Sequence, residues 1–173
     1  FSFYFTKAQT PEIVSKPEKK YLGMEPMLTL KDSTGTDVYY YQVNAFDDEL
    51  YGKAIRAMDK AIALYPERLD FRFMKANAYI AYEKESPDMA LPYLLDLAGR
   101  EKERKWTYED QVIEKGFYED ALQEYCYSFY SIGTPAAYDA FLALSQKLAS
   151  LYPDYLDFSN NIGSYHMIAK EDY

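Results

Sequence analysis

The sequence is poor in the residues that carry most enzyme chemistry. Its 173 residues contain one cysteine, Cys126, and one histidine, His166. One cysteine cannot form an intrachain disulfide, and two Cys/His residues do not supply the three or four ligands of a zinc site. A Cys–His or Ser–His nucleophile needs a base held beside it, and nothing in the sequence brings Cys126 and His166 together. We therefore predict no metal, no cofactor, no catalytic residues and no enzymatic activity.

Phosphate-binding loops and long apolar runs are lacking too. The seven glycines are scattered, and no Gly-x-Gly occurs, so a glycine-rich nucleotide loop is excluded. No run approaches the ~20 apolar residues that cross a membrane. The net charge of −9 argues against nucleic acid, because phosphate binding depends on Lys and Arg releasing counterions. We predict neither a nucleic-acid partner nor a transmembrane segment.

Aromatic residues are abundant instead. They make up 18% of the chain, and 20 of them are tyrosines. Tyrosine packs an apolar ring while its hydroxyl stays available to water or a partner. This composition favours a thin structure of paired helices with much half-buried surface. The stretch 100–105 alternates in charge and is interpreted as a solvated connection.

One eight-residue phrase occurs twice. The copies are 64–71, with the sequence LYPERLDF, and 151–158, with the sequence LYPDYLDF; six of the eight positions are identical. Proline cannot continue a helix, because it lacks the N–H and its ring clashes one turn back. Pro66 and Pro153 therefore predict a helix–turn–helix joint in each copy. We call the copies the first and second turn phrases, and such a repeat is typical of repeat architectures.

Apolar residues recur at helical spacing from residue 47 onward. Thr107 is expected to cap a short helix that ends near Gly116, and the order Gly133-Thr134-Pro135 predicts a stop, a cap and a first helical residue. The expected helices run approximately over 47–65, 69–85, 90–98, 107–116, 117–132, 135–152 and 156–167. The pattern predicts an antiparallel array of six or seven helices joined by short turns.

Residues 10–46 lack this pattern and are predicted to form an irregular N-terminal arm. Three prolines in this segment exclude a continuous helix. Residues 27–30 and 38–41 have β-forming composition around a turn at 32–36. The alternatives are a small hairpin and an extended arm lying across the first helices.

Residues 1–9 resemble the end of a signal peptide. The apolar run 1–5 is followed by small residues, which is typical of a segment cleaved after Ala8. The alternative is an apolar terminus that packs on the core. With a signal peptide and no cystines, we expect export in a bacterium to the periplasm or outer envelope. A cytoplasmic location stays open.

The helical part resembles the tetratricopeptide repeat (TPR) family. Ala54, Ala61 and Pro66 match the family spacing Ala-x6-Ala-x4-Pro. Further matching positions are Tyr79, Asn161–Tyr165 and Lys170–Tyr173. Lys75-Ala76 replaces the family's Leu-Gly step, and the two turn phrases start 87 residues apart, which is not a multiple of about 34. The resemblance covers 47–98 and 135–173.

The resemblance implies an all-α fold, a TPR-like α-solenoid over 47–173. It also implies a non-catalytic scaffold that binds a protein or peptide in the groove of the stacked repeats. On this resemblance the partner-binding face contains Asp70, Phe73, Asn77, Asn160, Asn161 and Ser164. The competing interpretation is that the asparagines are simply solvated helix positions.

Two other functions stay open. Tyrosine-rich surface favours a module that binds a glycan or another polymer of the bacterial envelope. Abundant carboxylates leave room for an acid pair of the glycosidase type, in which case the chain is a fragment of a larger helical enzyme. Since the last predicted helix would leave an apolar side uncovered, we also expect further repeats beyond Tyr173.

Overall fold

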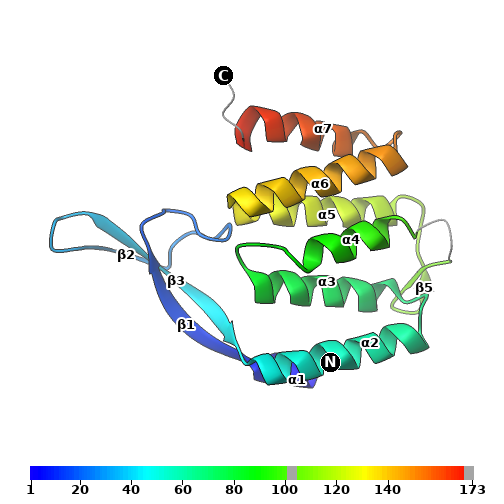
Figure 1. The fold of residues 1–173 in the computed structure, drawn as a ribbon, viewed down its shortest axis with the longest axis horizontal. Helices are drawn as coiled ribbons and strands as arrows, with labels where there is room; N and C mark the ends of the chain where they lie inside the picture. The colour runs from blue at the N-terminus through cyan, green and yellow to red at the C-terminus, as the bar shows by residue number, and fades with distance from the viewer. Residues whose placement is uncertain (101–104, 170–173) are drawn as a thin grey trace. The chain divides into compact units, whose positions relative to one another are not determined.

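The computed structural model describes residues 1–100 and 105–169, with side chains up to Met167. The chain divides into two compact units, Phe1–Lys60 and Ala61–Tyr173, here called unit 1 and unit 2. Both α-helices and β-sheets are present (Figure 1). Within the described residues, no helix is both long enough and apolar enough to cross a membrane.

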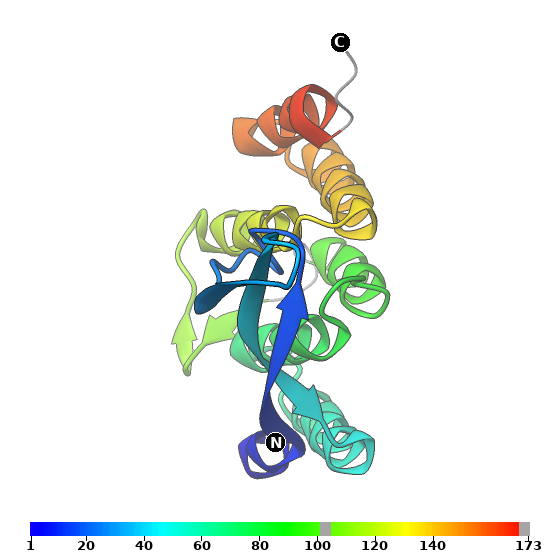
Figure 2. The same ribbon diagram turned by 90° about the vertical axis from the view of Figure 1, so that its left-hand side faces the viewer.

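Unit 1 contains a three-stranded antiparallel sheet, so the all-α prediction is wrong. Its strands β1 (Gln9–Lys16), β2 (Leu28–Lys31) and β3 (Asp37–Phe46) lie in the order β1-β3-β2 (Figure 2). The central strand β3 is rich in valine and tyrosine, residues that suit a pleated, half-buried surface. Pro11 excludes a helix but is compatible with the edge strand β1, where a missing N–H costs no internal ladder bond.

The hairpin between β2 and β3 is held by its turn. The Asp32 carboxylate accepts hydrogen bonds from the Thr34 and Thr36 N–H groups at 2.8 and 3.0 Å. The Thr34 hydroxyl donates to the same carboxylate at 2.7 Å, and this bond together with the two N–H bonds lowers the pKa of Asp32. Gly35 has a φ of +86°, which glycine adopts without strain. The hairpin alternative, drawn from the β-forming residues on either side of this turn, is therefore the one that the structure contains.

An aromatic cluster joins the helices of unit 1 to its sheet. Helix α1 (Ser2–Ala8) contributes Phe5, whose ring lies 5.7 Å from Phe46 of β3 and 6.4 Å from Tyr51. Tyr51 belongs to α2 (Asp48–Leu64), and the Asp47 N–H donates to the Ala8 carbonyl. Residues 1–9 thus pack against their neighbours, and whether they end a signal peptide stays a prediction.

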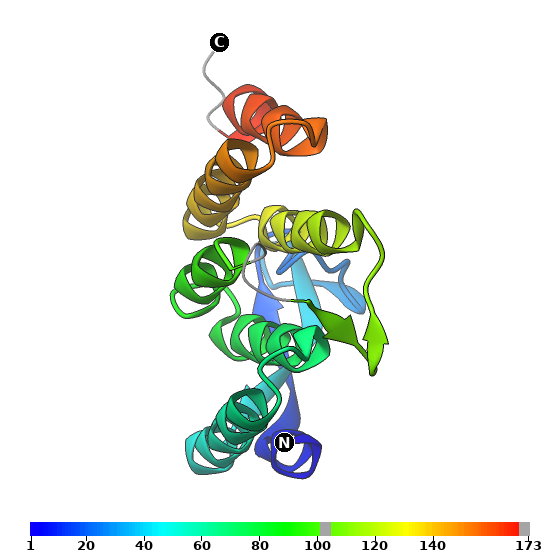
Figure 3. The ribbon, with the colours of Figure 1, turned by 90° about the vertical axis from the view of Figure 1, so that its right-hand side faces the viewer.

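Unit 2 consists mainly of helices that form close to the expected boundaries. They are α3 (Leu69–Glu83), α4 (Ala90–Ala98), α5 (Phe117–Ile132), α6 (Pro135–Leu151), α7 (Leu156–Ser164) and the π-helical turn η2 (Tyr165–Ala169). As predicted, Thr134 caps α6 by accepting from the Ala137 N–H at 3.2 Å. One core runs through all of them, including Leu94, Leu122, Phe129 and Leu144. In Figures 1 and 3, α3 and α7 lie at opposite ends of this stack.

The short helix expected at 107–116 is wrong. This segment forms a small hairpin of β4 (Thr107–Tyr108) and β5 (Gln111–Val112). The two residues between the strands, Glu109 and Asp110, have φ values of +48° and +67°. Positive φ at both positions is what a tight two-residue hairpin of the I′ type requires. Threonine is favoured both as a helix cap and in strands, so Thr107 alone does not distinguish a helix from a hairpin. The turn at Glu109 and Asp110 favours the hairpin.

The two turn phrases have the same backbone. In each, the N–H of the fifth residue donates to the carbonyl of the tyrosine, Arg68 to Tyr65 and Tyr155 to Tyr152, both at 3.1 Å. The tyrosine ring lies 6.2 Å from the terminal phenylalanine in both copies. The predicted joint is confirmed as a turn between helices at both prolines.

The two phrases bury opposite residues, however. Leu69 is fully buried, whereas the equivalent Leu156 is 68% exposed. Phe158 is fully buried, whereas the equivalent Phe71 is half-buried. The helices that follow the two turns, α3 and α7, therefore pack against the core with different faces.

Candidate functional site

Two of the three predicted binding residues on α3 are buried. The Asp70 carboxylate pairs with Arg68, at 2.6 Å to Nη2 and 2.8 Å to Nε. Phe73 packs on Tyr125, whose hydroxyl donates to the Phe73 carbonyl at 3.1 Å. Asn77 is exposed. Of the three predicted residues on this helix, only Asn77 has its side chain open to solvent.

The predicted residues on α7 are divided in the same way. Asn161 is 5% exposed, and its amide exchanges two hydrogen bonds with Gln123 of α5, at 3.0 and 2.8 Å. Asn160 is exposed and Ser164 is half-buried. Because α3 and α7 lie at opposite ends of unit 2 (Figure 3), the six predicted residues do not form one cluster.

The Arg68–Asp70 pair makes stability depend on pH. Its hydrogen bonds lower the pKa of Asp70. The stabilisation by Asp70 is therefore complete above the unfolded-state pKa of about 4 and is lost as pH falls through the lower folded-state pKa. We expect Asp70→Asn to destabilise the chain at neutral pH, and we expect a smaller difference from wild type at an acidic pH below the unfolded-state pKa of about 4. Urea unfolding at both pH values measures it.

Asp157 is the matched control for this prediction. It occupies the same position of the second turn phrase and is exposed. Asp157→Asn should change the free energy of unfolding by less than about 0.5 kcal/mol at either pH. A difference between wild type and Asp70→Asn that stays constant with pH would contradict the role of the ion pair.

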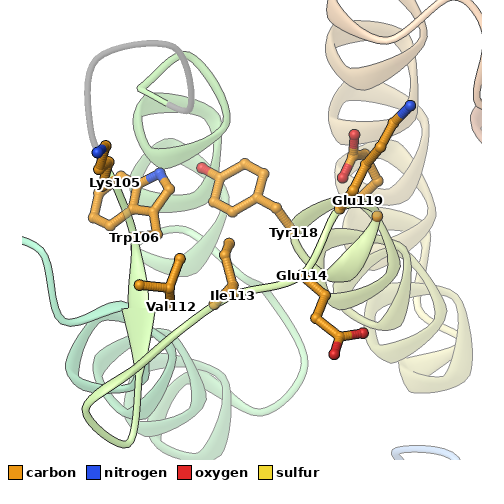
Figure 4. Close-up of a pocket in the computed structure, with 9 residues that line it drawn as sticks. Lys105, Trp106, Val112, Ile113, Glu114, Tyr118 and Glu119 are labelled. Carbon is orange, nitrogen blue, oxygen red and sulfur yellow. The ribbon is translucent and has the colours of Figure 1, made fainter.

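A hollow of about 480 Å³ opens between the β4–β5 hairpin and the start of α5 (Figure 4). Its apolar part is formed by Val112, Ile113 and the rings of Trp106 and Tyr118. Val112 is 71% exposed, while Trp106 is only 2% exposed. The charged residues along it are Lys105, Glu114, Lys115 and Glu119. The hollow thus has an apolar floor and charges of both signs.

A second hollow of about 360 Å³ continues the first. The two share Lys115, Gly116 and Glu119, and the second is otherwise lined by the second turn phrase, Leu151–Tyr155. We call the combined depression the groove; it is lined by residues 105, 106, 112–116, 118, 119 and 151–155. It is the candidate site because it joins half-buried aromatic surface to convergent charged and polar groups.

Tyrosine hydroxyls hold the walls of the groove in place. Tyr118 donates to the Leu97 carbonyl at 2.5 Å, and Tyr152 donates to the Ala98 carbonyl at 3.1 Å. Tyr155 donates to the Asp120 carboxylate at 2.7 Å. Burial and that carboxylate raise the pKa of Tyr155. Each ring is thereby tied to a neighbouring element, so the groove is largely preformed.

A glycine allows the chain to turn from the hairpin into α5. Gly116 has a φ of +93°, a conformation that is costly for residues with a Cβ. No side chain caps α5 at this position, so the N-terminal end of the helix opens toward the groove.

Neither the cysteine nor the histidine lines the groove. Cys126 is fully buried in the core, where burial raises the pKa of its thiol to about 11. His166 lies in η2 and is exposed. In residues 1–100 and 105–167, no group of three or more His, Cys, Asp or Glu side chains is arranged to hold a metal ion. What the groove offers is apolar contact, hydrogen bonding and charge.

The chain was compared with protein families, curated proteins and solved structures. No protein-family model, curated protein or solved structure matches the chain. Sequence reasoning missed the groove because residues 107–116 were assigned to a helix and 151–155 to a structural joint. The available signal was the sequence Thr-Tyr-Glu-Asp-Gln-Val, in which polar residues separate the β-forming Thr-Tyr pair from a β-forming valine.

Proposed function

We propose that the chain is a non-catalytic binding module whose groove holds a segment of a protein or peptide. The observation that carries this proposal is the pair of adjoining hollows lined by residues of 105–119 and by 151–155. Because the two hollows share Lys115, Gly116 and Glu119, one extended segment can occupy both. The resemblance of the helices to the TPR family and export to a bacterial envelope stay predictions.

The apolar residues of the groove support a peptide ligand. Val112 is the most exposed of the large apolar residues that line it, and covering it would remove apolar surface from water. The charged residues at the rim can pair with peptide side chains of either charge; they are Lys105, Glu114, Lys115 and Glu119. Interfaces of this kind combine an apolar centre with a polar, solvent-accessible edge.

The tyrosines favour a peptide over a glycan. Glycans are commonly held by open aromatic faces with free polar edges, and here the hydroxyls of Tyr118, Tyr125 and Tyr152 donate to backbone carbonyls inside the protein. Their rings contribute to the core and to the walls of the groove. Packing thus accounts for these three tyrosines.

Val112→Glu is expected to weaken peptide binding at least tenfold without unfolding the chain. The substitution places a charge where apolar contact is needed, and tenfold corresponds to about 1.4 kcal/mol. Peptides are first selected from a phage-displayed library of random dodecamers on the wild-type protein. Their affinities for the wild type and the variant are then measured by fluorescence anisotropy.

Leu64→Glu is the matched control. Leu64 is an aliphatic residue of similar exposure, 74%, that does not line the groove. The selected peptides should bind this variant as tightly as the wild type. Peptides that bind Val112→Glu and wild type equally would refute the groove as the binding site.

A further inference from the structure

The floor of the groove contains a buried donor without an acceptor. Trp106 is 2% exposed, and its indole N–H has no hydrogen-bond partner among the described residues. A buried polar group left unpaired costs about 1–3 kcal/mol. In Figure 4 the nitrogen-bearing edge of the indole faces Tyr118, and both rings line the same hollow. The donor therefore lies where a bound ligand could supply the missing acceptor.

A buried positive charge lies against the same indole. The Arg72 guanidinium is 5.3 Å from the centre of the Trp106 ring, and Arg72 is 8% exposed. Its Nη2 donates to the Pro66 carbonyl at 3.1 Å, whereas its Nε–H has no acceptor in the described part of the chain. Asp70, the acid nearest in sequence, pairs with Arg68 instead.

No carboxylate in residues 1–100 or 105–167 forms an ion pair with Arg72. The neighbouring Tyr93 hydroxyl interacts with it, but burial raises the pKa of Tyr93 to about 12, so that group stays neutral. A cation held over an aromatic face polarises the ring, which makes the indole N–H a better donor to a negative acceptor. The charge of Arg72 is thus available to an anion in the groove.

The rest of this end of the groove is favourable to negative charge. Lys105, next to Trp106 in the chain, lines the same hollow. Lys115 and Gly116, at the N-terminus of α5, line the part of the groove that both hollows share, and the helix N-terminus adds a partial positive charge there. Glu114 and Glu119 oppose an anion, yet in Figure 4 their carboxylates lie away from Trp106, beyond Ile113 and Tyr118. The Trp106 side is the more positive one.

We propose that the groove seats the carboxylate of an aspartate or glutamate side chain of the bound peptide beside Trp106. This inference rests on the proposed function and narrows it to acidic peptides. The carboxylate accepts from the indole N–H and pairs with Lys105, while Arg72 contributes its charge through the ring. Since the N–H is closed to water in the free chain, the ligand oxygen displaces a covering side chain to reach it.

We call the proposed carboxylate-binding position beside Trp106 the carboxylate seat. Trp106 is the only tryptophan, so its fluorescence reports directly on binding at the seat. The probes are acetyl-Ala-Glu-Ala-amide, acetyl-Ala-Gln-Ala-amide and inorganic phosphate, and both peptides lack a free C-terminal carboxylate. We expect a saturable change in Trp106 emission with the glutamate peptide. Its affinity should exceed that of the glutamine peptide about tenfold, which is typical of a charge-assisted hydrogen bond.

Lys105→Gln and Lys147→Gln are the test and control variants. Lys105 lines the groove, and Lys147 is an exposed lysine of α6 that does not. Lys105→Gln should weaken the glutamate peptide about three- to tenfold and leave the glutamine peptide unchanged. Lys147→Gln should alter neither.

The outcomes separate this inference from the proposed function. Equal affinities for the glutamate and glutamine peptides, both lost in Val112→Glu, would overturn the carboxylate seat and leave peptide binding intact. Phosphate that displaces the glutamate peptide at equal concentration would overturn the assignment to a peptide side chain. No emission change with any probe, while selected dodecamers still bind, would also overturn the seat. Failure of the dodecamers as well would overturn both.

Discussion

Leu69→Ala is expected to lower the free energy of unfolding by about 2–5 kcal/mol. Leu69 is fully buried in the core of unit 2, so truncation removes apolar contact and leaves a cavity. Leu156 holds the equivalent position of the second turn phrase and is 68% exposed. Leu156→Ala should therefore change the free energy by less than about 0.5 kcal/mol. Urea unfolding of both variants measures the difference.

The phenylalanines of the two phrases give the reverse order. Phe158 is fully buried and Phe71 is half-buried, so Phe158→Ala should cost about 3–5 kcal/mol and Phe71→Ala clearly less. Because each pair shares its residue type and its turn, the comparison isolates burial. Similar losses at Leu69 and Leu156 would contradict the opposite faces that the two helices present to the core.

Asn161→Ala is expected to destabilise the chain by about 1–3 kcal/mol. The substitution leaves the Gln123 amide without its partner inside the core, where Gln123 is 4% exposed. The free energy of unfolding, again from urea titration, measures the loss. Asn160→Ala, at the exposed neighbouring position, is the control and should be close to neutral.

A double variant separates the amide pair from general packing. Asn161→Leu with Gln123→Met removes both partners at similar volume and should recover at least ~1 kcal/mol relative to the sum of the single variants. Simple additivity would argue that the two amides do not stabilise each other. Lowered stability with unchanged binding of the selected peptides in Asn161→Ala would agree with the structural role, whereas lost binding at unchanged stability would favour the site expected from the sequence.

The local signals in the sequence were reliable where one feature decides the backbone. Pro66 and Pro153 end their helices, and Thr134 caps α6. These features act within one turn of the chain, so they can be recognised without knowing what packs against them. The opposite burial of Leu69 and Leu156 could not be recognised, because identical residues in identical turns differ only in their distant neighbours.

The sheet of unit 1 and the β4–β5 hairpin could not be predicted from local sequence signals. Residues 9–16 pair with 39–46, and a pairing over that distance leaves no mark within either strand. Thr107 and Tyr108 suit a helix start and a strand about equally, and the positive φ values at Glu109 and Asp110 are not implied by their residue types. The groove is formed by this hairpin and the second turn phrase together. Because these segments are distant in the sequence, local patterns could not predict that they lie side by side.

Hydrogen–deuterium exchange of the full chain, with and without a selected dodecamer, tests peptide binding in the groove most directly. Backbone amides covered by a ligand exchange more slowly, and the affected segments can be located by mass spectrometry. We predict slower exchange in 106–119 and 151–155, and no such effect in Val112→Glu. Protection centred on the exposed faces of α3 and α7, around Asn77 and Asn160, would contradict the groove and restore the site expected from the sequence.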